Sequence, residues 1–285
     1  MRIPFHPLKT RLLAHLEQVA RPRDPYWSPH EHKRVQHYIR QTWQIYGQVE
    51  SHEFRYYDQT HHNLVLALPA GNSYGYPPIV IGAHYDAVPA CPGADDNATG
   101  IAALLELAGF FATHPARHPI WLVAFDLEEY GLLGSQAYAQ HLKRQQQPLR
   151  LMLSLEMLGY CNQSTGSQHY PHPLLQRLYP DQGNFIGLIG NLPTLPDLLH
   201  LQRSLQHVGI PCQWLPTWDR GRILADIRAS DHAPFWDAGY RAVMVTDTAH
   251  LRNPHYHLSS DRIDTLDMDF FTGICQGIAQ GLHDL

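Results

Sequence analysis

The regular alternation of short apolar segments with helical segments is the feature that most constrains how this chain folds. Apolar segments at 78–82, 119–125 and 149–155 alternate with helical patterns at 98–114 and 135–144. Segments that are apolar throughout are typical of strands buried on both faces, so helices must cover both faces of their sheet. The sequence therefore predicts an α/β fold, with three α/β/α layers and a mixed, mostly parallel central sheet.

The segments before and after this alternation extend the same fold. Residues 6–47 show helical periodicity, and alternating polar and apolar residues over 48–69 predict a two-stranded hairpin. Further strands are expected at 185–189, 213–215 and 241–245, and further helices at 195–207 and 266–283. We predict one domain over 1–285, with N-terminal helices within 6–47 and a long loop excursion at 160–184.

Charge and hydropathy limit the partners of the chain. It carries 21 Lys and Arg against 26 Asp and Glu, a net charge of −5, without a basic cluster. This pattern argues against nucleic acid or an anionic membrane as a partner. The longest apolar stretch, 100–112, contains Glu106 and is too short to span a bilayer, and the first residues do not resemble a signal peptide. We therefore expect a cytoplasmic protein, and nothing in the sequence sets its oligomeric state.

Acidic residues and histidines follow the predicted strands. His84 and Asp86 follow the first apolar segment, Glu128-Glu129 the second and Glu156 the third. Ligands of open α/β sheets bind beyond the carboxyl ends of the strands, where these residues are expected. Burying two adjacent carboxylates at the end of an apolar strand is costly unless a cation or hydrogen bonds compensate them. The pattern therefore predicts a cation site.

Two further segments complete a set of candidate metal ligands. Asp95 and Asp96 precede a predicted helix, and His255 and His257 lie in a loop after a late predicted strand. Two histidines and three carboxylates suit two divalent ions, about 3.5–4 Å apart, that share one carboxylate and hold a water between them. Nitrogen and oxygen ligands without thiolate favour zinc. Such a site implies hydrolysis.

Five motifs stand in order along the central part of the chain. They are Gly82-Ala-His-Tyr-Asp86, Gly93-Ala-Asp-Asp-Asn-Ala-Thr-Gly100, Phe125-Asp-Leu-Glu-Glu-Tyr-Gly-Leu-Leu-Gly-Ser135, Ser230-Asp-His-Ala-Pro-Phe235 and Asn253-Pro-His-Tyr-His257. Together they resemble the signature blocks of the M28 metallopeptidases, which are co-catalytic zinc aminopeptidases. The resemblance covers about residues 78–266. It implies the zinc-aminopeptidase (phosphorylase/hydrolase-like) architecture and two Zn²⁺ ions per chain.

The resemblance, carried over position by position, implies a set of metal ligands. His84 and Glu156 are expected to hold one zinc, and Glu129 and His257 the other. Asp96 is expected to bridge the two ions. The chain departs from the family at Glu156, where the family usually has an aspartate that is shorter by one methylene.

The resemblance also implies roles for residues beside these ligands. Glu128 would be the general base that takes a proton from the metal-bridging water and passes it to the leaving amine. Tyr256 would donate a hydrogen bond to the substrate carbonyl oxygen as negative charge develops there. Asp86 is expected to orient the His84 imidazole, and Asp231 to lie near the site without binding a metal.

The function implied is that of an aminopeptidase that hydrolyses the N-terminal peptide bond of peptides with a free N-terminus. Two alternatives stay open: a single-zinc enzyme resembling glutaminyl-peptide cyclotransferases, and a non-catalytic binding domain of the same fold. The intact turn at 96–100 and the short link over 129–135 favour the peptidase. The pocket for the N-terminal residue is expected between the loops 160–184 and 214–229.

Many of the 21 histidines stand outside these motifs. We expect His61, His62 and the histidines of segment 28–37 to be solvated on the surfaces of the hairpin and the second helix.

Overall fold

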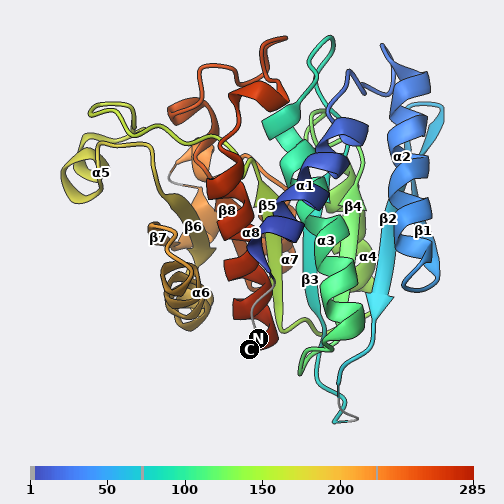
Figure 1. Cartoon of the computed structure of the whole chain (residues 1–285). Helices are drawn as coiled ribbons and strands as arrows, with labels where there is room; N and C mark the ends of the chain where they lie inside the picture. Colours follow the sequence, from blue (N-terminus) through green and yellow to red (C-terminus); the bar gives the residue numbers. More distant parts are fainter. Residues whose placement is uncertain (1–3, 72–73, 223) are drawn as a thin grey trace.

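The computed structural model describes residues 4–71, 74–222 and 224–285, so the predicted domain 1–285 also includes residues that lie outside this description. Within the described residues, eight strands form one sheet in the order β1-β2-β4-β3-β5-β8-β6-β7 (Figure 1). Their bounds are β1 Val49–Tyr56, β2 Gln59–Leu68, β3 Ile79–His84, β4 Ile120–Phe125, β5 Leu151–Glu156, β6 Ile186–Asn191, β7 Cys212–Thr217 and β8 Ala242–Thr246.

The three apolar segments that dominate the sequence form the centre of this sheet as β4, β3 and β5. They run parallel to one another, and β8 continues the parallel set next to β5. The predicted hairpin is present as β1 and β2, which pair antiparallel, and β2 joins β4 in antiparallel register. The sheet is therefore mixed with a parallel centre, as predicted, and the carboxyl ends of its central strands meet at one edge.

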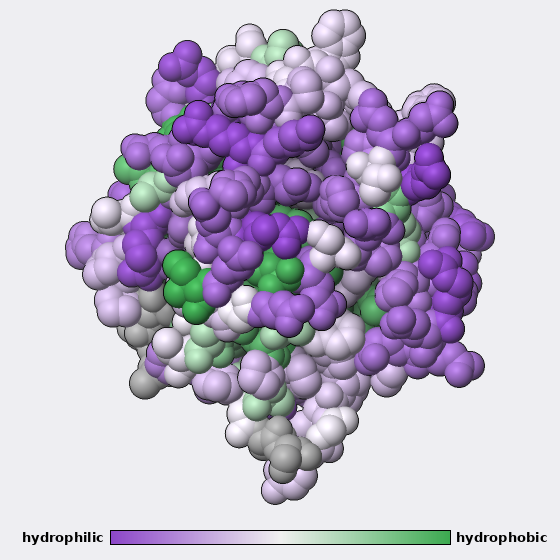
Figure 2. Space-filling model, turned by 90° about the vertical axis from the view of Figure 1, so that its right-hand side faces the viewer, coloured by the Kyte–Doolittle hydropathy of each residue, from purple (hydrophilic) through white to green (hydrophobic). Residues whose placement is uncertain are grey.

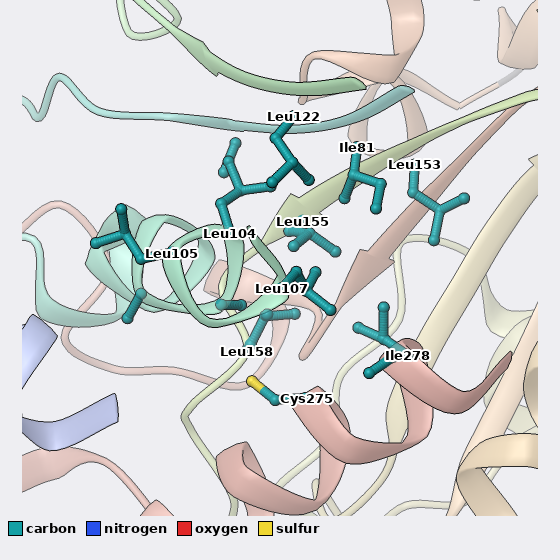
Figure 3. Packing of buried hydrophobic residues seen from close by; sticks show 14 of the residues in the cluster. Ile81, Leu104, Leu105, Leu107, Leu122, Leu153, Leu155, Leu158, Cys275 and Ile278 are labelled. Carbon is teal, nitrogen blue, oxygen red and sulfur yellow. The ribbon is translucent and has the colours of Figure 1, made fainter. Parts of the chain in front are cut away.

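Helices cover both faces of the sheet and give the expected three layers. The main helices are α1 Phe5–Val19, α2 Pro29–Gln44, α3 Gly100–Thr113, α4 Leu133–Arg144, α6 Leu195–His207 and α8 Met268–His283. The larger core joins one face of the sheet to α1, α2, α3, α6 and α8, and Figure 3 shows side chains of α3 and α8 gathered against the central strands. A smaller core packs α4 and a short helix, α7 His232–Ala238, on the opposite face.

The sequence analysis missed two short helices, α7 and α5 Pro173–Leu178. Each is at most seven residues long, too short to show a helical repeat of apolar residues. Helix α5 lies within the predicted excursion 160–184 and buries none of its residues. In α7, Phe235 and Trp236 are buried because the helix packs over the sheet.

The outer surface is largely polar on the side of α2 and β1. Figure 2 shows that face, where hydrophilic residues dominate and apolar residues appear only in small groups. None of the helices that the structure describes combines the length and the apolar character needed to cross a membrane.

Candidate metal centre

The parallel centre of the sheet brings the predicted ligands to one edge. His84 is the last residue of β3 and Glu156 the last residue of β5, and these two strands are hydrogen-bonded neighbours. Glu128 and Glu129 follow β4 on the other side of β3. His257 comes from the loop after β8. Each of these residues therefore lies at, or in the loop that follows, the carboxyl end of one of the four parallel strands.

Asp96 enters from the irregular helical turn η1, Ala94–Thr99, that leads into α3. Its neighbour Asn97 accepts a hydrogen bond at Oδ1 from the Gly100 amide, as an N-cap residue does, and donates through Nδ2 to the Leu155 carbonyl. A side chain at Gly100 would come within 2.8 Å of that same carbonyl oxygen. This close approach of the helix start to β5 places Asp96 over the strand ends.

The Asp96 carboxylate lies between two imidazoles. Its Oδ1 is 3.1 Å from Nε2 of His84, and its Oδ2 is 3.1 Å from Nε2 of His257. The same nitrogen of His257 is 3.2 Å from Oε2 of Glu129. The geometry therefore brings together four of the five predicted ligands, with Asp96 in the middle.

Glu156 also reaches this cluster. Its Oε1 is 3.6 Å from Nε2 of His84, and its Oε2 accepts a hydrogen bond of 2.7 Å from the hydroxyl of Ser230. Ligand atoms of His84, Glu128 and Glu156 lie within 4.8 Å of one another, and so do those of His84, Asp96 and Glu129. The longer side chain at position 156 thus remains within reach of a shared ion.

Asp86 supports both sides of the cluster. Its Oδ1 lies 3.4 Å from Nδ1 of His84, the nitrogen that faces away from Asp96. Its two carboxylate oxygens also accept hydrogen bonds of 3.2 Å from the backbone amides of Glu128 and Glu129. One buried carboxylate therefore links the orientation of the imidazole to the loop that carries the glutamate pair. Asp231, predicted near the site, is fully buried there.

The carboxylates of the site lie in an environment that disfavours their charge. Burial raises the pKa of Glu128 well above its ordinary value, although His84 opposes this shift. Burial, reinforced by Asp96, raises the pKa of Glu129 to about 7, and burial raises the pKa of Asp231 to about 7. Burial alone would raise the pKa of Asp96, but the imidazoles of His257 and His84 beside its two oxygens hold it below its ordinary value. Perturbed pKa values of this kind are typical of functional sites.

The donor atoms of the cluster fit divalent cations. Among the described residues, neither ring nitrogen of buried His84 nor the buried Oε1 atom of Glu129 has a hydrogen-bond partner of suitable geometry. Buried carboxylates without compensation are costly, and a divalent cation offsets that cost. Imidazole nitrogens and carboxylate oxygens are ligands that zinc accepts.

An apolar pocket opens beside Glu156 and Tyr256. Residues from the excursion 160–184 and from the segment 214–229 line it, although residue 223 of that segment lies outside the described residues. Apolar side chains of its wall include Phe185, Leu188, Trp214, Ile227 and Met244. The ring of Tyr256 stacks on that of His257 with centroids 3.7 Å apart, so the phenol lies between the cluster and this pocket.

The expectation that His61, His62 and the histidines of segment 28–37 are solvated is wrong for two of them. His32 and His61 are 7% and 5% exposed, and both contact the carboxylate of Asp126. His32 lies on α2 and His61 on β2, whereas Asp126 directly follows β4. No local pattern signalled this buried group, because its members meet only when helix α2 packs beside the hairpin.

Comparisons with known proteins show which sequences this chain is similar to. The model of peptidase family M28 matches residues 63–178. The Escherichia coli protein YfbL, described as uncharacterized, is 35% identical over 223 residues, which are 73% of this chain and 67% of that protein. The Bacillus subtilis aminopeptidase YwaD is 34% identical over 124 residues, 40% of this chain and 27% of that enzyme. This chain spans about half or less of the curated aminopeptidases that it matches.

The fold itself has solved counterparts. The LapA aminopeptidase of Legionella pneumophila superposes with a TM-score of 0.73 at 20% identity, over 96% of this chain and 70% of LapA. At this identity the likeness shows the fold. It confirms the α/β architecture of the zinc aminopeptidases predicted from the sequence.

Proposed function

This chain belongs to peptidase family M28, and from that premise we propose that it is a two-zinc aminopeptidase acting on peptides with a free N-terminus. The observation that carries the proposal is the placement of Asp96, whose two oxygens each lie 3.1 Å from a different imidazole. A carboxylate with one histidine at each oxygen is suited to bridge two ions. His84 and Glu156 would hold one ion, and Glu129 and His257 the other.

Zinc, when bound, supplies Lewis acidity that activates a water and polarises the substrate carbonyl. The side chains of the chain supply the proton transfers. Glu128 reaches within 4.0 Å of His84 Nε2 but belongs to neither proposed ligand pair, so its carboxylate is free to accept the proton of the attacking water. Its raised pKa suits a base that later gives the proton to the leaving amine.

The pocket and the surrounding acids orient the substrate. The cationic α-amino group of a peptide pairs with Glu128 and its acidic neighbours. A blocked N-terminus carries no positive charge and cannot form this ion pair. The first side chain enters the apolar pocket, where Leu188, Trp214 and Met244 favour an aliphatic or aromatic residue. Tyr256 lines this pocket and stacks on His257, and its hydroxyl would donate a hydrogen bond to the substrate carbonyl oxygen.

The test uses purified chain loaded with Zn²⁺ and then freed of excess metal. Zinc per chain is measured, and release of the first residue is followed on unblocked peptides and on the same peptides acetylated at the N-terminus. We expect about two zincs per chain and at least a hundredfold lower kcat/KM on the acetylated peptides. Absence of release from any unblocked peptide contradicts the proposal.

The same measurements separate the two alternative functions. One zinc per chain, with ammonia released from peptides that begin with glutamine, favours cyclisation. No tightly bound divalent ion favours a non-catalytic binding domain. The described geometry favours hydrolysis because donors for both ions are present around Asp96.

A further inference from the structure

A buried arginine lies beside the metal centre but comes from outside the segment matched by the family model. Arg23 belongs to the linker between α1 and α2, whereas the family model begins at residue 63. Its side chain is fully buried, and it ranks among the largest side chains of the described residues that have no exposure to solvent. Burying a guanidinium is costly unless every donor finds a partner.

The partners of Arg23 are backbone carbonyls, and most of them belong to the two loops that carry the central ligands. Its Nη1 donates to the carbonyls of Pro92 and of Arg21, the latter in its own linker. Its Nε donates to the Tyr85 carbonyl at 2.9 Å, one residue after His84. Its Nη2 donates to the carbonyls of Gly93 at 3.0 Å and Asp96 at 3.2 Å. One planar, permanently charged group therefore ties the loop after β3 to the turn before α3, a geometry that an ammonium group does not reproduce.

Gly93 leaves the space that this contact requires. Its φ of +55° lies in the left-handed region, and a Cβ at this position would come within 2.1 Å of the Asp96 carbonyl oxygen. The same Cβ would lie 3.0 Å from both terminal nitrogens of Arg23. The turn thus closes around the guanidinium with no room for a side chain.

Asp24, the residue after Arg23, contacts the loop that carries a third proposed ligand, Glu129. Oδ2 of Asp24 accepts a hydrogen bond of 2.7 Å from the hydroxyl of Tyr130, which directly follows Glu129. Oδ1 of Asp24 accepts from the amides of Tyr26 and Trp27 at 2.7 Å each, so the linker itself is held in one conformation. Arg23 and Asp24 together contact the loops of His84, Asp96 and Glu129.

We propose that Arg23 is a positioning residue for the metal centre: it fixes the backbone at His84 and Asp96 so that their side chains meet at the same ion. The inference rests on the proposed metal-dependent function, but it assigns to the α1–α2 linker a role that the ligand set alone does not include. Replacing a residue that contacts a metal ligand, without binding the metal itself, typically changes metal affinity or activity by about 10–100-fold.

The experiment compares zinc affinity among matched variants. Arg23→Met removes the charge and the donors, Arg23→Lys keeps the charge, and Arg21→Met is the control. Arg21 is two residues away and contacts Glu31 and the Glu17 carbonyl instead of the ligand loops. Zinc affinity is measured by competition with a chromophoric chelator, and the Tm of each metal-free protein is recorded separately.

We expect the Kd for zinc to rise about 10–100-fold in Arg23→Met, and to rise by a smaller factor in Arg23→Lys, with the control within about twofold of wild type. Tyr130→Phe, which removes only the hydrogen bond to Asp24, should give a weaker change in the same direction. A purely structural arginine would lower the Tm of the metal-free protein and leave the Kd unchanged, and that result overturns the inference.

The lysine variant keeps the test decisive if Arg23→Met does not fold. A wild-type Kd in folded Arg23→Lys contradicts the positioning role, because an ammonium group, with three N–H donors, cannot maintain all five carbonyl contacts of Arg23. A wild-type chain that takes up no zinc rejects the proposed function together with this inference. If the wild type takes up zinc and the Arg23 variants have the same Kd for zinc as the wild type, the inference is rejected but the proposed function is not.

Discussion

The hydroxyl of Ser230 donates a hydrogen bond of 2.7 Å to Oε2 of Glu156, and the other oxygen of that carboxylate lies 3.6 Å from His84. Glu156 is the residue at which the family resemblance led us to expect a shorter aspartate. The contact with Ser230 fixes the longer side chain in one orientation and leaves Oε1 facing the cluster. The serine therefore offers a physical reason why glutamate is tolerated at the end of β5.

Loss of this contact should weaken one of the two proposed zinc sites. We expect Ser230→Ala to raise the Kd for zinc about tenfold, because Glu156 gains rotational freedom that binding must then remove. Ser204→Ala is the control, since Ser204 donates to the Gly277 carbonyl within the helical layer. Zinc competition measures both variants. Equal affinities for Ser230→Ala and wild type would show that the serine does not position Glu156.

Replacing the proposed base should separate proton transfer from metal binding. Glu128→Gln keeps the shape of the side chain but cannot accept a proton, so kcat should fall by about 10²–10⁴-fold while zinc per chain stays at the wild-type value. Turnover of a leucine anilide and metal analysis of the same preparation give both readouts. Loss of zinc in this variant would make Glu128 a ligand, in keeping with its closeness to His84 and Glu156.

The Tyr256 hydroxyl should act on the transition state more than on substrate binding. Tyr256→Phe keeps the ring stacked on His257, so we expect kcat to fall by about tenfold or more with KM within threefold. Steady-state kinetics on an unblocked peptide tests this expectation, with exposed Tyr57→Phe as the control. A change confined to KM would assign the phenol to ground-state binding.

Filling the apolar pocket should alter the preference for the first residue of the substrate. Met244 lines the pocket from β8, and Met244→Phe reduces the space for a large side chain. We expect kcat/KM to fall at least tenfold for peptides that begin with leucine or phenylalanine, and to change less than threefold for those that begin with alanine. The alanine substrates are the internal control. A uniform loss across substrates would place the first residue elsewhere.

The buried His232 should make folding stability sensitive to acid. Burial lowers the pKa of His232 to about 3, although its hydrogen bond to the Ile227 carbonyl opposes the shift. The unfolded chain, with an ordinary histidine pKa of about 6.5, then binds a proton that the folded chain does not. Stability is therefore complete above about pH 6.5 and is lost as the pH falls toward 3.

Urea unfolding of the chelator-treated protein measures this effect. Between pH 8 and pH 5 the wild type should lose about 2 kcal/mol more than His232→Gln. His37→Asn, at an exposed position of α2, should behave as wild type. Identical pH dependence of wild type and His232→Gln would show that another group titrates in this range.

Local patterns in the sequence were sufficient for the α/β fold and for placing candidate ligands at the strand ends. Each apolar strand segment is contiguous, and His84, Glu128-Glu129 and Glu156 stand at or just after the ends of such segments. Since parallel strands bring their carboxyl ends to one edge, a parallel sheet predicts that these residues lie at the same edge. The N-cap contact of Asn97 with Gly100 spans three residues and is likewise visible in the sequence.

The residues that support the ligands were decided by the tertiary structure. Arg23 contacts Asp96 at a sequence separation of 73 residues, and Ser230 contacts Glu156 at a separation of 74. No periodicity or motif in the sequence indicates either pair. His32 and His61 looked like surface histidines because burial of a polar side chain depends on a partner, here Asp126, that only the packed chain supplies. The periodicity of apolar residues indicates which side chains face a core. Whether a buried polar group finds a hydrogen-bond partner depends on residues that are distant in the sequence and become neighbours only in the folded chain.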